Sequence, residues 1–246
     1  MIGFAVSEQD AQAMSDDIMA YSEQCTPFQL KKNDYLCIVE DASGAQIWIG
    51  LKKGADGQME MAAVNPALRG EGTTDVVVSA DVSPVQWKPF ENAILVRFGA
   101  EKVPFVVDLA DPRELPRFTP DAKLTVDLTA FADALTLHES EAAYYASQSG
   151  REIKFSADHF IPSGMFAGGA KDEEGPTAHA AFAGKILKAA LRQNGTGKGS
   201  YWWMLVETFG GARINVVADP AMVKAPPRVG GHLEGEFWIS GRLAKK

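Results

Sequence analysis

The sequence predicts an α+β protein made predominantly of antiparallel β-strands, with two helices. Most of the chain consists of short apolar segments separated by turns rich in Gly, Asp and Pro, and only two segments show helical spacing. Hydrophobic residues make up 46% of the 246 residues and charged residues 23%, which is ordinary for a globular protein. No apolar run approaches the roughly 18 residues that a membrane span needs, so we expect no membrane association.

The first helix is expected over residues 7–25. Ser7 is a suitable N-cap, and Asp10 follows three residues later, close to a capping box. Apolar side chains then recur at helical spacing up to Pro27, namely Met14, Ile18, Tyr21 and Cys25. The same segment has no basic start and no long apolar core, so it is not a signal peptide and we expect a cytoplasmic protein.

The two cysteines, Cys25 and Cys37, lie twelve positions apart. In a reducing compartment we expect them to be small buried hydrophobes rather than a disulfide. They do not form a C-x-x-C pair, so the sequence predicts no zinc site.

Strands are expected after the first helix. Residues 34–40, 46–52 and 58–64 are separated by "DASGA" and "KGADG", which predicts a meander of antiparallel hairpins. The segments "TDVVVSADV", "NAILVRFG" and "VPFVVDL" continue this pattern, and residues 123–128 alternate as a further strand.

The second helix is expected directly after residue 128. Side chains recur there at helical spacing, and Gly150 supplies a stop: Phe131, Leu135, His138, Ala142 and Tyr145. Residues 151–162, "REIKFSADHFIP", are then expected to form one more strand.

Charge divides the chain into two parts. The net charge is −8, but ten basic and four acidic residues from His179 onward give +6, which leaves −14 for residues 1–178. Between the parts, a segment rich in Gly and charge has no periodicity. We therefore predict an acidic α+β domain over 1–165, a linker over 166–178 and a basic domain over 179–246, and the two charged parts could contact each other.

The basic part is expected to be all strand. "AAFAGKILKAALRQ" could be a helix in isolation, but Gly184 and the following pattern favour a long bent strand. A hairpin, "SYWWMLVETFG" with "ARINVVAD", a Pro-rich connection and a closing strand, "HLEGEFWISGRL", follow. This order resembles an OB-fold barrel, which implies a partly open five-stranded barrel whose second and third strands form the ligand face.

The stretch "GTGKGSYWW", residues 195–203, resembles a phosphate-binding loop only in part. Such a loop needs G-x-x-x-x-G-K-[ST] between a strand and a helix, whereas here Gly199 follows Lys198 and a β-like segment follows both. We therefore expect a hairpin turn.

Aromatic and basic residues alternate on the predicted barrel in the way that single-stranded nucleic acid requires. The predicted ligand-binding residues are Lys198, Trp202 (or its neighbour Trp203), Arg213, Trp238 and Arg242. The competing interpretation is that the tryptophans fill the core of a small barrel. Glu234 and Glu236, on the same face as Trp238, also count against phosphate.

Two stretches, 94–128 and 204–239, have a similar order of features. Each has a strand, a Phe-Gly turn, a Val-Val strand, Ala-Asp-Pro, a Pro-Arg connection and a last strand. Asp111 matches Asp219 in this alignment, and Pro112 matches Pro220. One hypothesis is therefore a duplicated β unit, and the other is chance similarity between hairpins.

No reaction class is indicated by the sequence. The four histidines show no metal-ligand spacing, and we predict no catalytic residue, metal or cofactor. We expect a non-catalytic binding protein whose partner is another protein or a single-stranded nucleic acid. The alternatives are an acidic immunity or inhibitor-type protein with a basic partner, and an enzyme, which a deep pocket holding a histidine and a carboxylate in hydrogen-bond reach would support.

Overall fold

The structure is a computed structural model that describes residues 2–4, 11–83, 89–98, 103–165 and 176–244. It is an α+β fold dominated by antiparallel strands, as predicted, with the helices α1 (Ala11–Ser22) and α2 (Glu141–Ser147). The expected cap at Ser7 and most of the expected linker over 166–178 lie outside the described residues.

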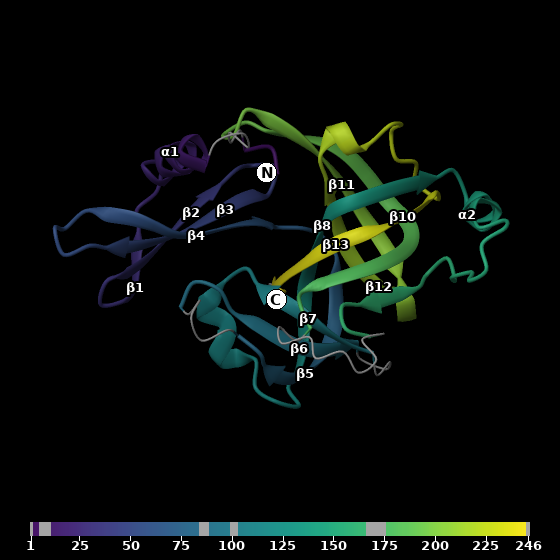
Figure 1. Ribbon diagram of the computed structural model, residues 1–246, viewed down its shortest axis with the longest axis horizontal. Helices are drawn as coiled ribbons and strands as arrows, with labels where there is room; N and C mark the ends of the chain where they lie inside the picture. Colours follow the sequence, from purple (N-terminus) through teal and green to yellow (C-terminus); the bar gives the residue numbers. More distant parts are fainter. Residues whose placement is uncertain (1, 5–10, 84–88, 99–102, 166–175, 245–246) are drawn as a thin grey trace.

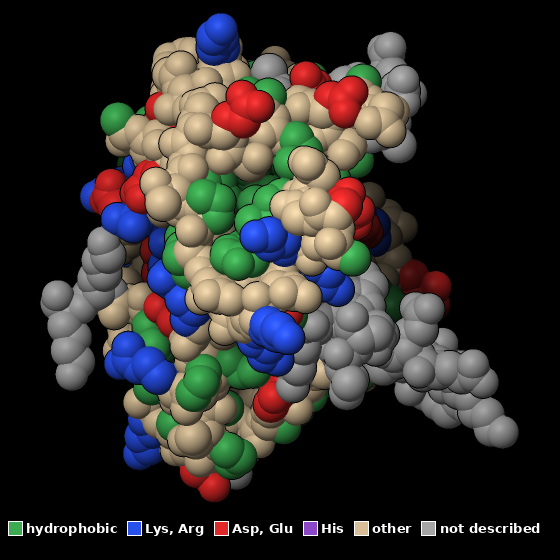
Figure 2. Space-filling model, turned by 90° about the vertical axis from the view of Figure 1, so that its left-hand side faces the viewer, with side chains coloured by type: hydrophobic (Ala, Val, Ile, Leu, Met, Phe, Trp, Pro, Cys, Tyr) green, Lys and Arg blue, Asp and Glu red, His purple; other side chains and the backbone are tan. Residues whose placement is uncertain are grey.

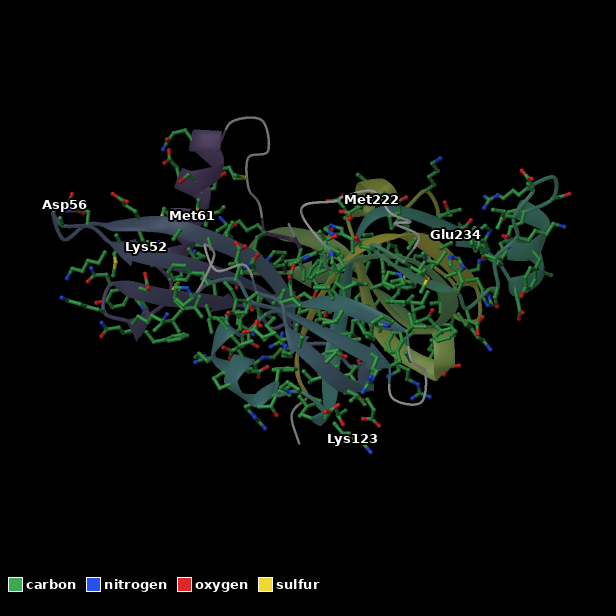
Figure 3. The ribbon with its side chains drawn as sticks, turned by 60° about the horizontal axis from the view of Figure 1, so that its bottom comes forward. Lys52, Asp56, Met61, Lys123, Met222 and Glu234 are labelled. Carbon is green, nitrogen blue, oxygen red and sulfur yellow. A yellow bond between two sulfur atoms is a disulfide. The ribbon has the colours of Figure 1, made fainter. Side chains whose placement is uncertain are left out.

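The first four strands form a separate antiparallel sheet, which we call the arm. Its order is β1-β2-β3-β4, and the tip carrying Asp56 lies far from the rest of the molecule (Figures 1 and 3). A view from the arm side shows Lys and Arg side chains around hydrophobic ones (Figure 2). The strands are β1 (Phe28–Lys31), β2 (Asp34–Glu40), β3 (Ala45–Lys53) and β4 (Met59–Leu68).

Nine further strands form a second sheet. They are β5 (Thr73–Asp81), β6 (Ala93–Phe98), β7 (Pro104–Leu109), β8 (Lys123–His138), β9 (Phe160–Pro162), β10 (His179–Asn194), β11 (Gly199–Thr208), β12 (Ala212–Ala218) and β13 (His232–Leu243). This sheet closes into two five-stranded rings, which makes it barrel-like (Figure 1). The first ring contains β5, β6, β7, β13 and β8, and the second contains β10, β11, β12, β8 and β13.

The two rings share β8 and β13, which pair antiparallel from Val126 to His138. Each ring is closed by one parallel pairing to the shared strands. In the first ring β7 pairs with β13, and in the second ring β12 pairs with β8. A strand from the predicted 1–165 domain therefore completes the ring of the predicted 179–246 domain. The division into domains stays a prediction.

One apolar core runs through both rings. It includes Val96 and Phe105 from the first ring, Met204 and Ile214 from the second, and Phe237 from the shared pair. A second core lies between the arm, α1 and the outer face of β11, where Ile47 and Cys37 pack with Trp203. Both faces of β11 are thus buried, which stabilises the arm against the second ring.

The prediction of a helix directly after residue 128 was wrong. Residues up to His138 continue β8, and α2 begins only at Glu141, after Ser140, whose side chain accepts a hydrogen bond from Ala143 N–H. The apolar spacing in this region fits a helix, but pairing with β13 along the whole segment outweighs that local preference. Only Phe160–Pro162 of the strand expected over 151–162 is a strand.

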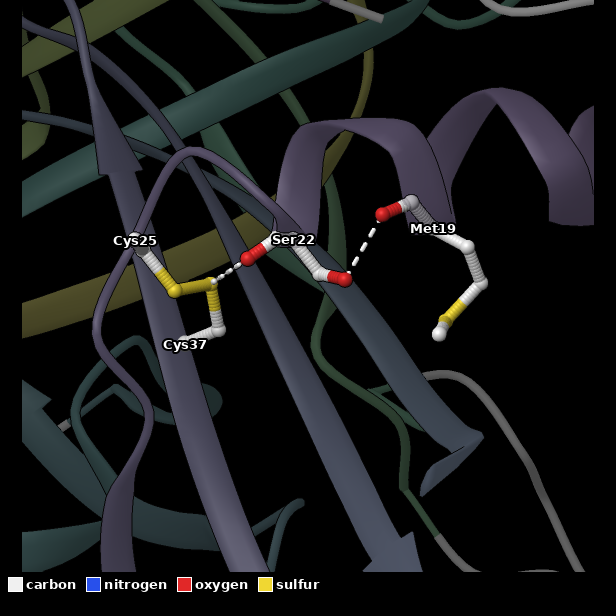
Figure 4. Close-up of a disulfide and its surroundings, with 4 residues drawn as sticks. All are labelled: Met19, Ser22, Cys25 and Cys37. Carbon is white, nitrogen blue, oxygen red and sulfur yellow. Dashed lines mark hydrogen bonds between the residues drawn. A yellow bond between two sulfur atoms is a disulfide. The ribbon is translucent and has the colours of Figure 1, made fainter. Parts of the chain in front are cut away.

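The prediction for the cysteines was also wrong. Cys25 and Cys37 form a disulfide that joins the segment after α1 to β2, with a Cα–Cα distance of 5.9 Å (Figure 4). Cys37 Sγ lies 3.6 Å from the carbonyl oxygen of Ser22, at the end of α1. Disulfides persist in oxidising environments, so the expectation of a cytoplasmic protein loses the support of reduced cysteines.

Candidate functional site

The predicted turn between β10 and β11 is a hairpin, as expected for "GTGKGSYWW". Lys198 is exposed there and has a φ of +60°, and Gly199 N–H donates to the carbonyl of Gly3 at 2.9 Å. A side chain at Gly199 would meet the backbone of Gly3. The glycines of this turn therefore admit the N-terminal segment.

The five predicted ligand-binding residues lie in different environments. Trp202 packs against the core inside the rings, and Arg213 lies at the start of β12, 3.5 Å from Glu207. Trp238 Nε1 donates to Asp108 at 2.6 Å, and Arg242 donates to Gln46 Oε1 at 3.0 Å. These side chains do not form one surface with Lys198, and ligand binding by them stays a prediction.

Arg242 belongs to a buried network that fixes the connection between the arm and the first ring. Asn215 Oδ1 accepts from Gly72 N–H at 3.2 Å, and its Nδ2 donates to Asp127 at 2.7 Å. Burial raises the pKa of Asp127 to about 6, although Arg242 and the hydrogen bonds from Gly70 and Asn215 oppose that shift. The network explains why Asn215 is fully buried without an energetic penalty.

An open groove of about 750 Å³ lies where the arm meets β10. Its walls come from the β2–β3 turn, from the end of β4 and from β10. The lining residues are Glu40, Asp41, Ala42, Ser43, Gly44, Arg69, Glu71, Arg192 and Gln193. Charged side chains of both signs therefore face one concave surface.

Arg192 is the most precisely held cation of the groove. Its guanidinium lies 3.9 Å from the ring centroid of Trp203, and Nη1 donates to the carbonyl of Ser43 at 3.0 Å. Glu71 approaches it at 3.7 Å and accepts from Lys188 Nζ at 2.5 Å. Glu71 is about half exposed, so water or another anion can reach Lys188 and Arg192.

Asp41 fixes the opposite wall. Burial raises its pKa, but hydrogen bonds from Ser43 and Thr196 outweigh burial and lower the pKa to about 2. Thr196 N–H donates to Asp41 Oδ2 at 3.0 Å, which connects the arm to the β10–β11 turn. Ser43 N–H also donates to Asp41 Oδ1 at 2.8 Å, within the β2–β3 turn.

The β10 strand presents an open backbone edge beside the groove. Residues 188–194 pair with β11 on one side, and in the described part of the chain no strand pairs with their other side. β13 and β9 pair only with residues 179–185. Leu191 lies in this open segment and is 47% exposed.

No local sequence motif marks the groove, because its residues come from three separate segments. The charge split was the available signal. Glu71, from the acidic part, contacts Lys188 and Arg192 from the basic part. Asp133, also from the acidic part, lies 3.8 Å from His179 of the basic part. The two parts are therefore in electrostatic contact.

The chain matches no family model, and comparison with curated proteins gives no match. Across the residues that the structure covers, no group of three or more His, Cys, Asp or Glu could hold a metal ion. Within the same residues, no helix is long and apolar enough to cross a membrane. The groove must therefore be interpreted from its own geometry.

Proposed function

We propose that this chain is a non-catalytic binding protein that takes an extended acidic segment of a protein partner into the groove beside β10. The observation that carries the proposal is Arg192, held on Trp203 beside an open strand edge and paired with a displaceable carboxylate. Strand addition supplies main-chain hydrogen bonds, and a fixed arginine selects a carboxylate by charge-assisted hydrogen bonds.

Glu71 supports this proposal because it occupies the position that a partner carboxylate would take. It reaches both Lys188 and Arg192 from the start of the first ring, while about half its side chain stays exposed. An exposed ion pair of this kind contributes little to stability, so its exchange for a partner's carboxylate costs little.

A protein partner fits the groove better than a nucleic acid does. Stacking of bases needs exposed aromatic rings, but Trp203 is 3% exposed and covered by Arg192.

The test titrates the full chain with a short capped peptide of alternating Val and Glu and monitors binding by nuclear magnetic resonance. We expect binding with a dissociation constant on the order of 0.1–1 mM, with shifted amides in residues 188–193. Glu71→Gln should tighten binding several-fold because the internal competitor is lost, and Arg192→Gln should weaken it about tenfold. The matched control is Arg213→Gln, which removes an exposed ring arginine outside the groove.

Equal binding of a peptide in which Lys replaces Glu would overturn the proposal. So would unchanged affinity in Glu71→Gln and Arg192→Gln. If a single-stranded oligothymidylate bound instead, with a steep loss of affinity in salt, the nucleic-acid prediction would replace it.

We also propose that the two rings derive from a duplicated OB-type unit whose last strands have been exchanged. Each unit runs as two hairpin strands, a 3₁₀ turn and a long strand, β6-β7-β8 and β11-β12-β13. Asp111 and Asp219 cap equivalent 3₁₀ turns, accepting from Arg113 N–H at 3.0 Å and from Ala221 N–H at 2.7 Å. Pro112 and Pro220 follow at the first position of each turn.

A further inference from the structure

A second concave site lies at the end of β8 near α2, away from the groove. It is a pocket of about 270 Å³ with mainly apolar walls. The lining residues are Leu137, His138, Glu139, Ile186, Ala225, Pro226, Pro227 and Arg228. Figure 3 labels Glu234 at this end of the molecule, and its side chain contacts His138.

The walls of this pocket are already fixed. Gly230 N–H donates to the carbonyl of Ile186 and Ile186 N–H to the carbonyl of Gly231, each at 2.8 Å. A side chain at Gly231 would lie 2.8 Å from the carbonyl oxygen of His138, so the loop follows the end of β8 closely. Consecutive prolines, Pro226 and Pro227, stiffen the same wall. A ligand would therefore find a preformed space rather than having to order one.

The imidazole of His138 is also held in one orientation. Its Nε2 lies 3.2 Å from Glu234 Oε1, and its ring meets the ring of Tyr144 edge-on at 5.4 Å. Tyr144 is fully buried and donates to the carbonyl of Ser156 at 3.1 Å. With Nε2 engaged by Glu234, Nδ1 is the ring nitrogen that would serve a ligand.

Arg228 supplies a cation at the rim. Its only ion-pair partner in the described part of the chain is Glu139, at 3.7 Å, and the two side chains are 73% and 81% exposed. Such a loose pair is readily replaced. The neighbouring Val229 is 69% exposed, so this loop presents apolar surface that the fold itself does not use.

We propose that this pocket binds a small carboxylate with a single apolar ring. A dry cavity of about 150 Å³ accepts benzene, so the larger volume here accommodates one ring with a carboxylate group. The ring lies against Leu137, Ile186 and the prolines, the carboxylate replaces Glu139 at Arg228, and His138 contributes a hydrogen bond. The carboxylate within hydrogen-bond reach of His138 is Glu234, which does not line the pocket, so the condition set above for an enzyme is not met and the proposal is limited to binding.

The test uses the full chain with benzoate as the probe and its neutral counterpart benzamide as the comparison. Nuclear magnetic resonance titration should show shifts at residues 137, 138, 186 and 225–228 on addition of about 10 mM benzoate, as for a millimolar ligand. Arg228→Gln should weaken benzoate binding about tenfold and leave benzamide unchanged. Ala225→Trp, at an exposed wall position, should abolish both by filling the space.

Arg213→Gln serves as the matched control, because Arg213 is another exposed arginine with one acidic partner. The proposal fails if benzoate shifts no resonance around the pocket. It also fails if Arg228→Gln and Arg213→Gln weaken benzoate equally, which would indicate non-specific attraction to cations. Shifts confined to residues 188–193 would instead place benzoate in the groove.

Discussion

At the scale of single residues, the structure is held together by polar side chains that no local pattern distinguishes. Asn215 is the clearest case, because one amide serves Glu71 N–H, Gly72 N–H and the indole of Trp203. In the sequence it is the middle residue of "RINVV", an ordinary strand position. Its role depends on segments more than 140 positions away, so sequence reasoning could not have found it.

Replacing Asn215 with Leu should therefore be far more costly than a surface change. The variant leaves the indole of Trp203 and the Gly72 amide buried without partners, which should lower the free energy of unfolding by roughly 3 kcal/mol. Urea denaturation followed by tryptophan fluorescence measures this change. Gln193→Leu, at an exposed position of β10, is the control and should change stability by less than about 0.5 kcal/mol.

Asp41 should make stability depend on pH in acid. Its pKa is about 2 in the folded protein, whereas an unfolded aspartate titrates near 3.9, so its contribution is complete above about pH 4 and is lost as the pH falls towards 2. Asp41→Asn should lose about 2 kcal/mol at pH 7, and the gap from the parent should close over that acidic range.

Thermal unfolding between pH 2 and 7 measures both chains. Asp133→Asn, at a 57% exposed carboxylate, should follow the parent throughout. A gap of constant size from pH 7 to pH 2 would show that the Asp41 carboxylate is not what stabilises this wall.

At the scale of elements, strands with a period of two were predictable and the end of β8 was not. β2 spans Asp34–Glu40 and β10 spans His179–Asn194, close to the predicted segments. The segment after residue 128 carries apolar residues that satisfy helical spacing. Its partner β13 lies about a hundred positions further along, and only that pairing decides the outcome.

The disulfide should stabilise α1 more than the rings. Bonding across twelve positions restricts the unfolded chain, so reduction should cost about 2–3 kcal/mol at most. Hydrogen exchange should become faster in α1 and β2 on adding a phosphine reductant, with β8 and β13 unaffected. A Cys25→Ala/Cys37→Ala chain should not respond to the reductant, and equal acceleration in all strands of the parent would contradict a local role.

At the scale of the whole molecule, the resemblance to a barrel was visible in the sequence but its closure was not. The order of β10 to β13 was predicted from strand spacing and turns. The strand that completes their ring, β8, precedes them by about 40 positions, beyond the segment on which the resemblance rested. The five predicted ligand-binding residues do not form one surface, because they lie on different strands and on both faces of the ring.

The sharing of β8 predicts the behaviour of fragments. Residues 179–246 alone lack that strand and would expose the core residues Ile214 and Phe237, so we expect this fragment to be unfolded by circular dichroism. Mixing it with residues 1–178 should restore the native spectrum. A fragment that folds and unfolds cooperatively on its own would instead support the division into independent domains.

The position of β13 in the chain also determines when the protein can become compact during synthesis. Both barrels require this strand, and the ribosome makes it after all the others. Until β13 has been made, the apolar cores of both rings are exposed to solvent, and the nascent chain must be shielded from other polypeptide chains. A pause in translation before β13 has been made would therefore prolong exposure to chaperones and proteases.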